Sequence, residues 1–234
     1  MEIKQQNCKI LALFTIIDYS VGCTVSDLFL TNGVSINLLT HGHGAANAEI
    51  YDLLGFGEPK KAIIISVLTE PMAHHILKSL RTEINLNKPG TGIAFTVPIN
   101  GISSALSQLC SFSEAKVNCE SEGVPMTQNE PYDLIITIVN NGYFSQVMEV
   151  ATAAGANGGT LIHGRGLTTQ EATKFLGITI QPEKDIVMIL APHDKKQTIM
   201  ENIIQEVGLS TAGKGICFSL PVSTALGLGT HSIS

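Results

Sequence analysis

The sequence has few charged residues, no surplus of basic ones and no long apolar run. Only 15% of its 234 residues are charged, and 14 Lys and Arg stand against 20 Asp and Glu, which gives a net charge of −6. Nucleic-acid binding needs basic surface, so this balance argues against a general nucleic-acid-binding protein, though not against one small anion pocket. The longest apolar stretches, such as residues 63–68, are too short to span a bilayer, and residues 1–7 are polar. We therefore expect a cytoplasmic protein without membrane insertion.

The number and spacing of the cysteines do not fit a disulfide framework or a zinc site. The five cysteines are an odd number, and no CxxC pair occurs among them. This pattern is typical of reduced thiols in a reducing compartment. The sequence also lacks a Ser-His-Asp order, a paired-carboxylate motif and a P-loop. We therefore expect a protein that is not an enzyme.

What the sequence does contain is a repeat. The segment HGHG at 41–44 returns as HGRG at 163–166, an offset of 122 residues. The segment GIAFTVP at 92–98 returns as GICFSLP at 215–221, an offset of 123 residues. Two motifs in one order at nearly one spacing indicate a duplicated domain.

Both halves show the same alternation of strand-like and helix-like patterns. Apolar, β-branched runs predict four strands in the first half, over 10–17, 35–40, 62–68 and 93–97, and four in the second, over 134–139, 159–163, 185–190 and 216–220. Apolar residues at helical spacing follow the first and third strand of each half. Gly33 and Gly155 close the first helix of each half, as C-terminal caps do. The order β-α-β-β-α-β predicts an α+β fold of two tandem ferredoxin-like repeats with antiparallel sheets.

The predicted boundaries follow from composition and turn signals. The first repeat covers 8–106, a flexible linker 107–130, the second repeat 131–226 and a loose tail 227–234. A short helix is also predicted over 168–176. Asp194, with Gln197 three residues on, has the spacing of a capping box.

The strands do not alternate between apolar and polar residues, as the run Ile63-Ile64-Ile65 shows. Both faces of each sheet therefore need cover, and the helices supply it for one face only. Packing against the other repeat or against further subunits would cover the second face. We therefore expect a homo-oligomer.

Two glycine-rich segments are the best candidates for a binding site. They are 163–166, after the second strand of the second repeat, and 213–215, before its fourth strand. Glycine lets backbone N–H groups converge on an anion, and Arg165 and Lys214 add positive charge. In a ferredoxin-like unit these two strands are not neighbours, so a site built from both would lie at the edge of a repeat or subunit. The alternative is that the glycines serve only turns.

The stretch AAGANGGTLIHGRG at 153–166, together with GKGICFSLPV at 213–222, resembles the PII (P-II) nitrogen-regulatory family. The resemblance covers most of the chain and is closer in the second repeat. It implies a trimeric, ferredoxin-like signal-transduction protein that binds an adenine nucleotide (ATP, ADP or AMP) in clefts between subunits and regulates a transporter or enzyme partner. The nucleotide-binding residues that it implies are Gly164, Arg165, Gly166, Gly213, Lys214 and Gly215, with Gly42, His43, Gly44, Gly90 and Gly92 in the first repeat.

The sequence departs from the family pattern in three places. Ile216, and Ile93 in the first repeat, stand where the family has a phosphate-binding lysine. Residues 222–234 contain no counterpart of the family's basic C-terminal loop. Tyr51 lies in the loop after the second strand without the family's modification motif, so we expect no uridylylation.

The two halves are not equally charged at the candidate site. Arg165 and Lys214 in the second repeat correspond to His43 and Thr91 in the first. If only one half binds an anion, we expect it to be the C-terminal half.

Two other functions stay open. His41, His43 and His163 lie on equivalent segments, and histidines two apart on an extended strand share a face, which a metal ion can use. No cysteine or carboxylate stands at a ligand spacing from them, so we assign no metal ligand. The second alternative is a structural or interaction module whose clefts have degenerated and no longer bind a ligand.

Overall fold

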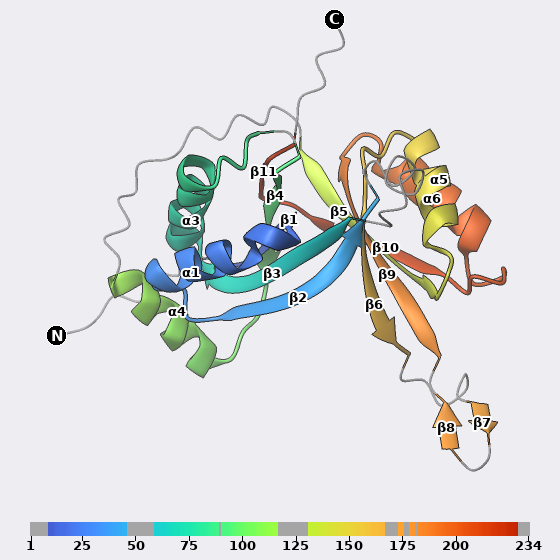
Figure 1. The fold of residues 1–234 in the computed structure, drawn as a ribbon, viewed down its shortest axis with the longest axis horizontal. Coiled ribbons are helices and arrows are strands. Elements are labelled where there is room, and N and C mark those ends of the chain that lie inside the picture. The colour runs from blue at the N-terminus through green and yellow to red at the C-terminus, as the bar shows by residue number, and fades with distance from the viewer. Residues whose placement is uncertain are drawn as a thin grey trace, which may run out of the picture. The chain divides into compact units, whose positions relative to one another are not determined.

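The computed structural model describes residues 9–45, 59–88, 90–116, 131–166, 173–175, 178–180 and 182–228. Within these residues the chain packs into two compact units (Figure 1). Unit 1 takes its residues from 1–40, 62–129 and 222–234, and unit 2 from 41–61 and 130–221. In the described part of the chain, no helix has the length and apolar character needed to cross a membrane.

Unit 1 is a sheet of strands with helices between them in the chain. Its elements are β1 (Ile10–Asp18), the 3-10 turn η1 (Tyr19–Val21), α1 (Gly22–Thr31), β2 (Asn37–Gly44), β3 (Lys60–Thr69), α3 (Glu70–Glu83), β4 (Gly92–Ile99), α4 (Ser104–Lys116) and β11 (Thr224–Leu226). The strands lie in the order β2-β3-β1-β4-β11. β1 pairs antiparallel with β4, from Ile10 opposite Ile99 to Ile17 opposite Gly92.

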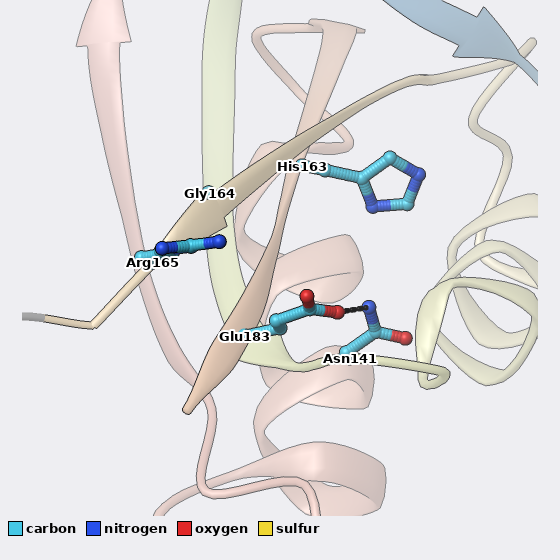
Figure 2. Close-up of a pocket in the computed structure, with 5 residues that line it drawn as sticks. All are labelled: Asn141, His163, Gly164, Arg165 and Glu183. Atoms are coloured by element: carbon cyan, nitrogen blue, oxygen red, sulfur yellow. Dashed lines mark hydrogen bonds between the residues drawn. The ribbon is translucent and has the colours of Figure 1, made fainter. Parts of the chain in front are cut away.

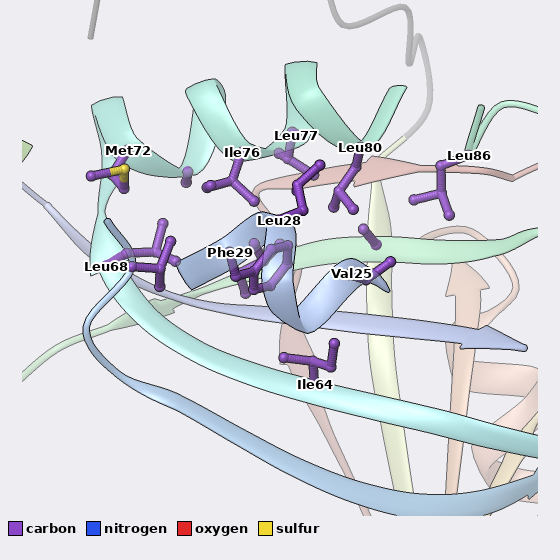
Figure 3. Packing of buried hydrophobic residues seen from close by; sticks show 14 of the residues in the cluster. Val25, Leu28, Phe29, Ile64, Leu68, Met72, Ile76, Leu77, Leu80 and Leu86 are labelled. Carbon is purple, nitrogen blue, oxygen red and sulfur yellow. The ribbon is translucent and has the colours of Figure 1, made fainter. Parts of the chain in front are cut away.

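The core of unit 1 lies between the sheet and helices α1 and α3. Figure 3 shows Val25 and Phe29 of α1 and Ile76 of α3 gathered over the strand residue Ile64. Each of these side chains is fully buried. Burying one such side chain contributes about 1.5–3 kcal/mol, so the helical spacing of apolar residues is what holds both helices on the sheet.

Unit 2 has the element order β-α-β, then a two-stranded hairpin, then β-α-β. Its elements are β5 (Tyr132–Asn140), α5 (Phe144–Ala153), β6 (Thr160–Arg165), β7 (Thr173–Phe175), β8 (Ile178–Ile180), β9 (Glu183–Pro192), α6 (Lys196–Val207) and β10 (Ile216–Pro221). The sheet runs β10-β5-β9-β6, and β7 and β8 form a separate antiparallel hairpin. The C-terminal end of β2, which belongs to unit 2, pairs with β6 through His43 opposite Leu161.

The prediction of a mixed helix-and-strand fold with antiparallel pairing is confirmed. In both units the first and third strands are central and the second and fourth lie outside them. This is the arrangement of strands in a ferredoxin-like βαββαβ unit. That the two units arose by duplication of one domain stays a prediction.

One face of the unit 2 sheet is apolar and carries neither of that unit's long helices. Side chains that alternate away from the core under α5 and α6 form this face, which we call the open face. Phe218 and Ile216 on it are 41% and 45% exposed. Its members are Leu134, Ile136, Ile138, Ile162, Ile186, Met188, Leu190, Ile216, Phe218 and Leu220.

The prediction of a short helix over 168–176 is wrong for the part of that segment that the structure describes. Residues Thr173–Phe175 form strand β7, which pairs with β8. The two strands contain Thr, Phe and Ile, which favour extended backbone, and pairing between them outweighs the weak helical spacing. The remainder of the segment, 168–172 and Leu176, lies outside the described residues.

The predicted flexible linker begins with a helix instead. Residues 107–116 belong to α4, and 117–130 lie outside the described residues. Helix α4 is fixed to unit 1 by Cys110, which is 3% exposed and whose thiol lies 3.6 Å from the Val67 carbonyl oxygen. A hydrogen bond of 2.6 Å also joins the hydroxyls of Ser113 and Ser35. These contacts with distant residues carry no signal in the local sequence.

Two segments belong to a different unit from the repeat in which the sequence placed them. Strand β11 was placed in the second repeat, but it pairs with β4 in unit 1, where Ala225 lies opposite Phe95 and is 4% exposed. The segment 41–45 was placed in the first repeat and belongs to unit 2. In both cases backbone pairing with the other half's sheet decides the place of the segment.

Helix ends follow the predictions in part. Gly33 after α1 and Gly155 after α5 have φ of 76° and 100°, the left-handed conformation expected of glycine C-caps. The capping box of Asp194 is wrong, because Lys195 is the N-cap residue of α6 and makes no side-chain cap. Gln197 instead donates a hydrogen bond to Glu201 at 2.7 Å, one turn further along the helix.

Candidate functional site

A cleft opens at one end of the unit 2 sheet, where β5 and β6 end and β9 begins. Its volume is about 430 Å³, and Asn141, His163, Gly164, Arg165 and Glu183 line it. Figure 2 shows His163 and Arg165 extending from β6, with Glu183 and Asn141 beside them from β9 and the turn after β5. Of these five residues, Gly164 and Arg165 are predicted site residues.

One side of the cleft is a carboxylate held by an amide. Glu183 lies opposite Arg165 in the register of β6 and β9. The side-chain amide of Asn141 donates to Glu183 Oε2 at 3.0 Å, and the Asn141 backbone N–H donates to the Glu183 carbonyl at 3.2 Å. The other oxygen of the Glu183 carboxylate can accept a hydrogen bond from a bound molecule.

The other side of the cleft carries a cation. Arg165 is exposed at the last position of β6. Within the described residues, its guanidinium makes no hydrogen bond or ion pair. Its five N–H donors in a planar fork match a carboxylate or a phosphate group.

A buried carboxylate stands behind the cleft. Asp185 is 1% exposed, and its two oxygens lie 3.0 Å from His163 Nδ1 and 2.9 Å from the backbone nitrogen of Gly142. Gly142 has φ of 92°, a conformation that glycine adopts without strain, and thereby presents its N–H to the carboxylate. A buried carboxylate needs such donors, and they fix the position of the half-exposed His163 ring.

His43 lies next to His163. The two ring centres are 5.8 Å apart, and the ring planes are inclined by 59°. The Nδ1 atom of His43 is buried and has no hydrogen-bond partner among the residues that the structure describes. His43 reaches this position because it lies opposite Leu161 in the pairing of β2 with β6.

The predicted backbone-amide site for an anion is not formed in the described residues, because the structure already uses the relevant N–H groups. Gly44 donates to the Pro59 carbonyl at 3.0 Å, Gly166 to Pro182 at 2.9 Å, and Gly215 to Val207 at 2.7 Å. The N–H groups of Gly213 and Lys214 donate to the side chain and carbonyl of Thr211. Among the side chains that line the cleft, Arg165 is the cationic one.

The predicted site residues fall into separate groups. Gly164, Arg165 and Gly166 lie at the end of β6, whereas Gly213, Lys214 and Gly215 precede β10 at the other edge of the sheet, with β5 and β9 between. Gly42, His43 and Gly44 lie in β2 and not in a loop. Gly90 and Gly92 belong to unit 1.

Three residues at or behind the cleft were not predicted as site residues: Asn141, Glu183 and Asp185. Asp185 carried a weak signal, because it is a carboxylate directly before the apolar run of β9, at a position where burial calls for a partner. Glu183 and Asn141 carried none, since their place depends on the turns that end β5 and begin β9. Among the described residues, no three His, Cys, Asp or Glu side chains are grouped to hold a metal ion.

Comparison with known proteins gives a partial structural likeness. No protein-family profile and no curated protein matches the chain. The solved structure of Arabidopsis thaliana PII bound to citrate is 22% identical, over 41% of this chain and 78% of that one, with a TM-score of 0.31. The B. subtilis GlnK–ATP complex is 15% identical, over 40% and 84%, with a TM-score of 0.31.

A third similar structure is a Bacillus cereus protein related to NIF3. It is 15% identical, over 44% of this chain and 29% of that chain, with a TM-score of 0.32. At these identities and TM-scores, the likeness concerns only the fold of part of the chain.

Proposed function

We propose that the protein is a non-enzymatic, PII-like regulatory protein of the cytoplasm that binds a small anionic ligand in the cleft of unit 2. The observation that carries the proposal is the Arg165 guanidinium, which faces a 430 Å³ cleft without a partner among the described residues. An arginine placed this way offers paired donors to a carboxylate or phosphate. The resemblance of the repeats to PII proteins selects an adenine nucleotide as the first ligand to test.

The rest of the cleft narrows the class of ligand. Glu183 on the opposite side bears negative charge and keeps one oxygen outside its bond with Asn141. A ligand with anionic groups alone would be repelled there. A molecule with an anionic group toward Arg165 and an N–H or hydroxyl donor toward Glu183 satisfies both sides. ATP, ADP and AMP combine such groups.

Two residues that line the cleft lie at the ends of the segment that contains the β7–β8 hairpin, so a bound ligand could influence that hairpin. Arg165 ends β6 and Glu183 begins β9, and the β7–β8 hairpin lies between them in the chain (Figure 1). A ligand that contacts both residues joins the two ends of that segment. Ligand binding would then favour one arrangement of the hairpin and change its docking to a regulated transporter or enzyme.

Assembly follows from the open face. Phe218 and Ile216 on this face are exposed, whereas Leu134, Met188 and Leu190 are buried. Exposed apolar side chains that lie together are costly in water, and burial against another subunit removes the cost. We propose a homo-oligomer formed through this face, with a trimer favoured by the PII resemblance.

A thermal-shift panel tests the proposal. ATP, ADP and AMP, each with and without Mg²⁺, are compared for the wild type, Arg165→Gln and Lys214→Gln. Ligand at 100 times its Kd stabilises by about 2.7 kcal/mol, which raises the Tm by roughly 5–10 °C in a chain of this size. We expect Arg165→Gln to abolish the rise and Lys214→Gln, at the other edge of the sheet, to keep it.

The competing function is an interaction module whose clefts no longer bind. It predicts no shift with any nucleotide while the oligomer stays intact. A shift lost in Lys214→Gln and kept in Arg165→Gln would contradict the placement of the site in this cleft.

A further inference from the structure

His43 and His163 form the closest pair of imidazoles among the rings described. Both belong to unit 2, and their centres are 5.8 Å apart. They reach each other because His43 stands opposite Leu161, and His163 follows Leu161 by two residues on the same face of β6. The pairing of two strands far apart in sequence therefore brings the rings together.

The His43 ring contains an unsatisfied polar atom. Its Nδ1 atom is buried, and no group in the described part of the chain forms a hydrogen bond with it. Buried polar atoms are nearly always satisfied, and an exception calls for a bound water, ion or ligand.

The His163 ring is held in a form that can coordinate a metal ion. Its Nδ1 lies 3.0 Å from the buried Asp185 carboxylate, which can only accept, so Nδ1 carries the proton. The lone pair then resides on Nε2. A carboxylate behind a histidine is the usual outer support of a metal ligand, because it fixes the ring and raises its basicity.

We propose that His43 and His163 bind a divalent transition-metal ion such as Zn²⁺, with Asp185 as a positioning residue behind His163. Metal–nitrogen bonds of about 2.0–2.1 Å place the centres of two coordinated imidazoles about 5–6 Å apart, as observed here. Imidazole ligands suit Zn²⁺, Ni²⁺ and Cu²⁺. The described residues supply no third ligand, so water or a small anion completes the shell, and binding is weaker than at a structural zinc site.

The metal site shares His163 with the lining of the proposed nucleotide cleft, so it is tested with the metal alone, in the absence of nucleotide. Isothermal titration of ZnCl₂ into the wild type should show one equivalent bound per chain. Binding should weaken at lower pH, because protonated imidazoles do not coordinate. We expect His43→Gln and His163→Gln each to lower the affinity at least tenfold, and Asp185→Asn to lower it about 10–100-fold with both ligands still present.

His193→Gln is the matched control. His193 also pairs with a buried carboxylate, with Nδ1 2.6 Å from Asp133, but Lys196 occupies that carboxylate's other oxygen at 3.2 Å. It lies at the opposite end of β9, so we expect its replacement to leave zinc affinity unchanged.

A measurement on the wild type covers the case in which a variant does not fold. Nitrogen-15 spectra of the histidine rings during a Zn²⁺ titration should move the signals of His43 and His163 and leave that of His193. No zinc binding by the wild type, equal binding in both single variants, or shifts confined to other histidines would each overturn the proposal.

Discussion

The Asp185 carboxylate lies 3.0 Å from Nδ1 of His163 and accepts a second hydrogen bond, of 2.9 Å, from the backbone of Gly142. One buried carboxylate thus joins the turn after β5 to strand β6. The cleft depends on that join, because Asn141 and Arg165 stand on the two elements that it connects.

Replacing Asp185 should therefore destabilise the protein more than replacing its partner. In Asp185→Ala the Gly142 N–H and the His163 ring both lose a charged acceptor, and we expect a loss of about 1.5–3 kcal/mol in the free energy of unfolding. His163→Ala removes a side chain that is 55% exposed, so its cost should be smaller. Urea unfolding of both variants measures the difference, and a larger loss for His163→Ala would contradict this view of Asp185.

Gly92 was predicted to bind a ligand, and the structure gives it a structural role. Its φ is 150°, and a Cβ atom there would meet the backbone oxygen of Ile16. We expect Gly92→Ala to lower the free energy of unfolding by about 1–3 kcal/mol without any ligand present. Gly90→Ala is the control, since Gly90 has φ of 86° but open space around it. Equal losses in thermal unfolding of the two variants would show that contact with Ile16 is not the cause.

Cysteine reactivity should follow burial. Burial raises the pKa of the Cys110 thiol. It also raises the pKa of Cys217, where a hydrogen bond from Thr137 opposes the effect. A raised pKa leaves less thiolate near neutral pH, so both should be alkylated more slowly than the exposed Cys23. Peptide mapping after timed iodoacetamide treatment measures each rate, and faster modification of Cys110 than of Cys23 would be the contrary result.

The open face predicts the site of self-association. Phe218→Lys places a charge on it, and we expect the mass from light scattering to fall toward that of a single chain. Leu209→Ser is the control, because Leu209 is 66% exposed but precedes β10 and lies off this face. An oligomer that survives Phe218→Lys and dissociates in Leu209→Ser would place the interface elsewhere.

The parts of the fold that sequence predicted are those that local patterns encode. Apolar runs marked the central strands, and Gly33 and Gly155 end helices because a left-handed residue is needed there. Helix α4 was missed, since its place depends on Cys110 packing against β3, far away in the chain. Strand β7 was missed because its local sequence favours helix and strand about equally, and pairing with β8 makes it a strand.

Local motifs pointed to some of the residues that line the cleft, whereas strand pairing determines the place of the others. Arg165 could be found because the HGRG segment recurs with a change of charge from His43. The repeat also suggested that both glycine segments share a site, but strand order places Gly213 at the other edge of the sheet. Asn141 and Glu183 meet Arg165 only through the pairing of β5, β9 and β6, which no local motif records.

Calorimetric titration of the wild type and of Arg165→Gln with ATP, ADP and AMP, with and without Mg²⁺, tests the central claim most directly. We predict that at least one of these nucleotides binds the wild type, and that Arg165→Gln weakens that binding at least tenfold, because the ligand's anionic group loses its paired donors. Absence of binding by the wild type, or equal binding by the variant, would contradict a nucleotide site built on Arg165.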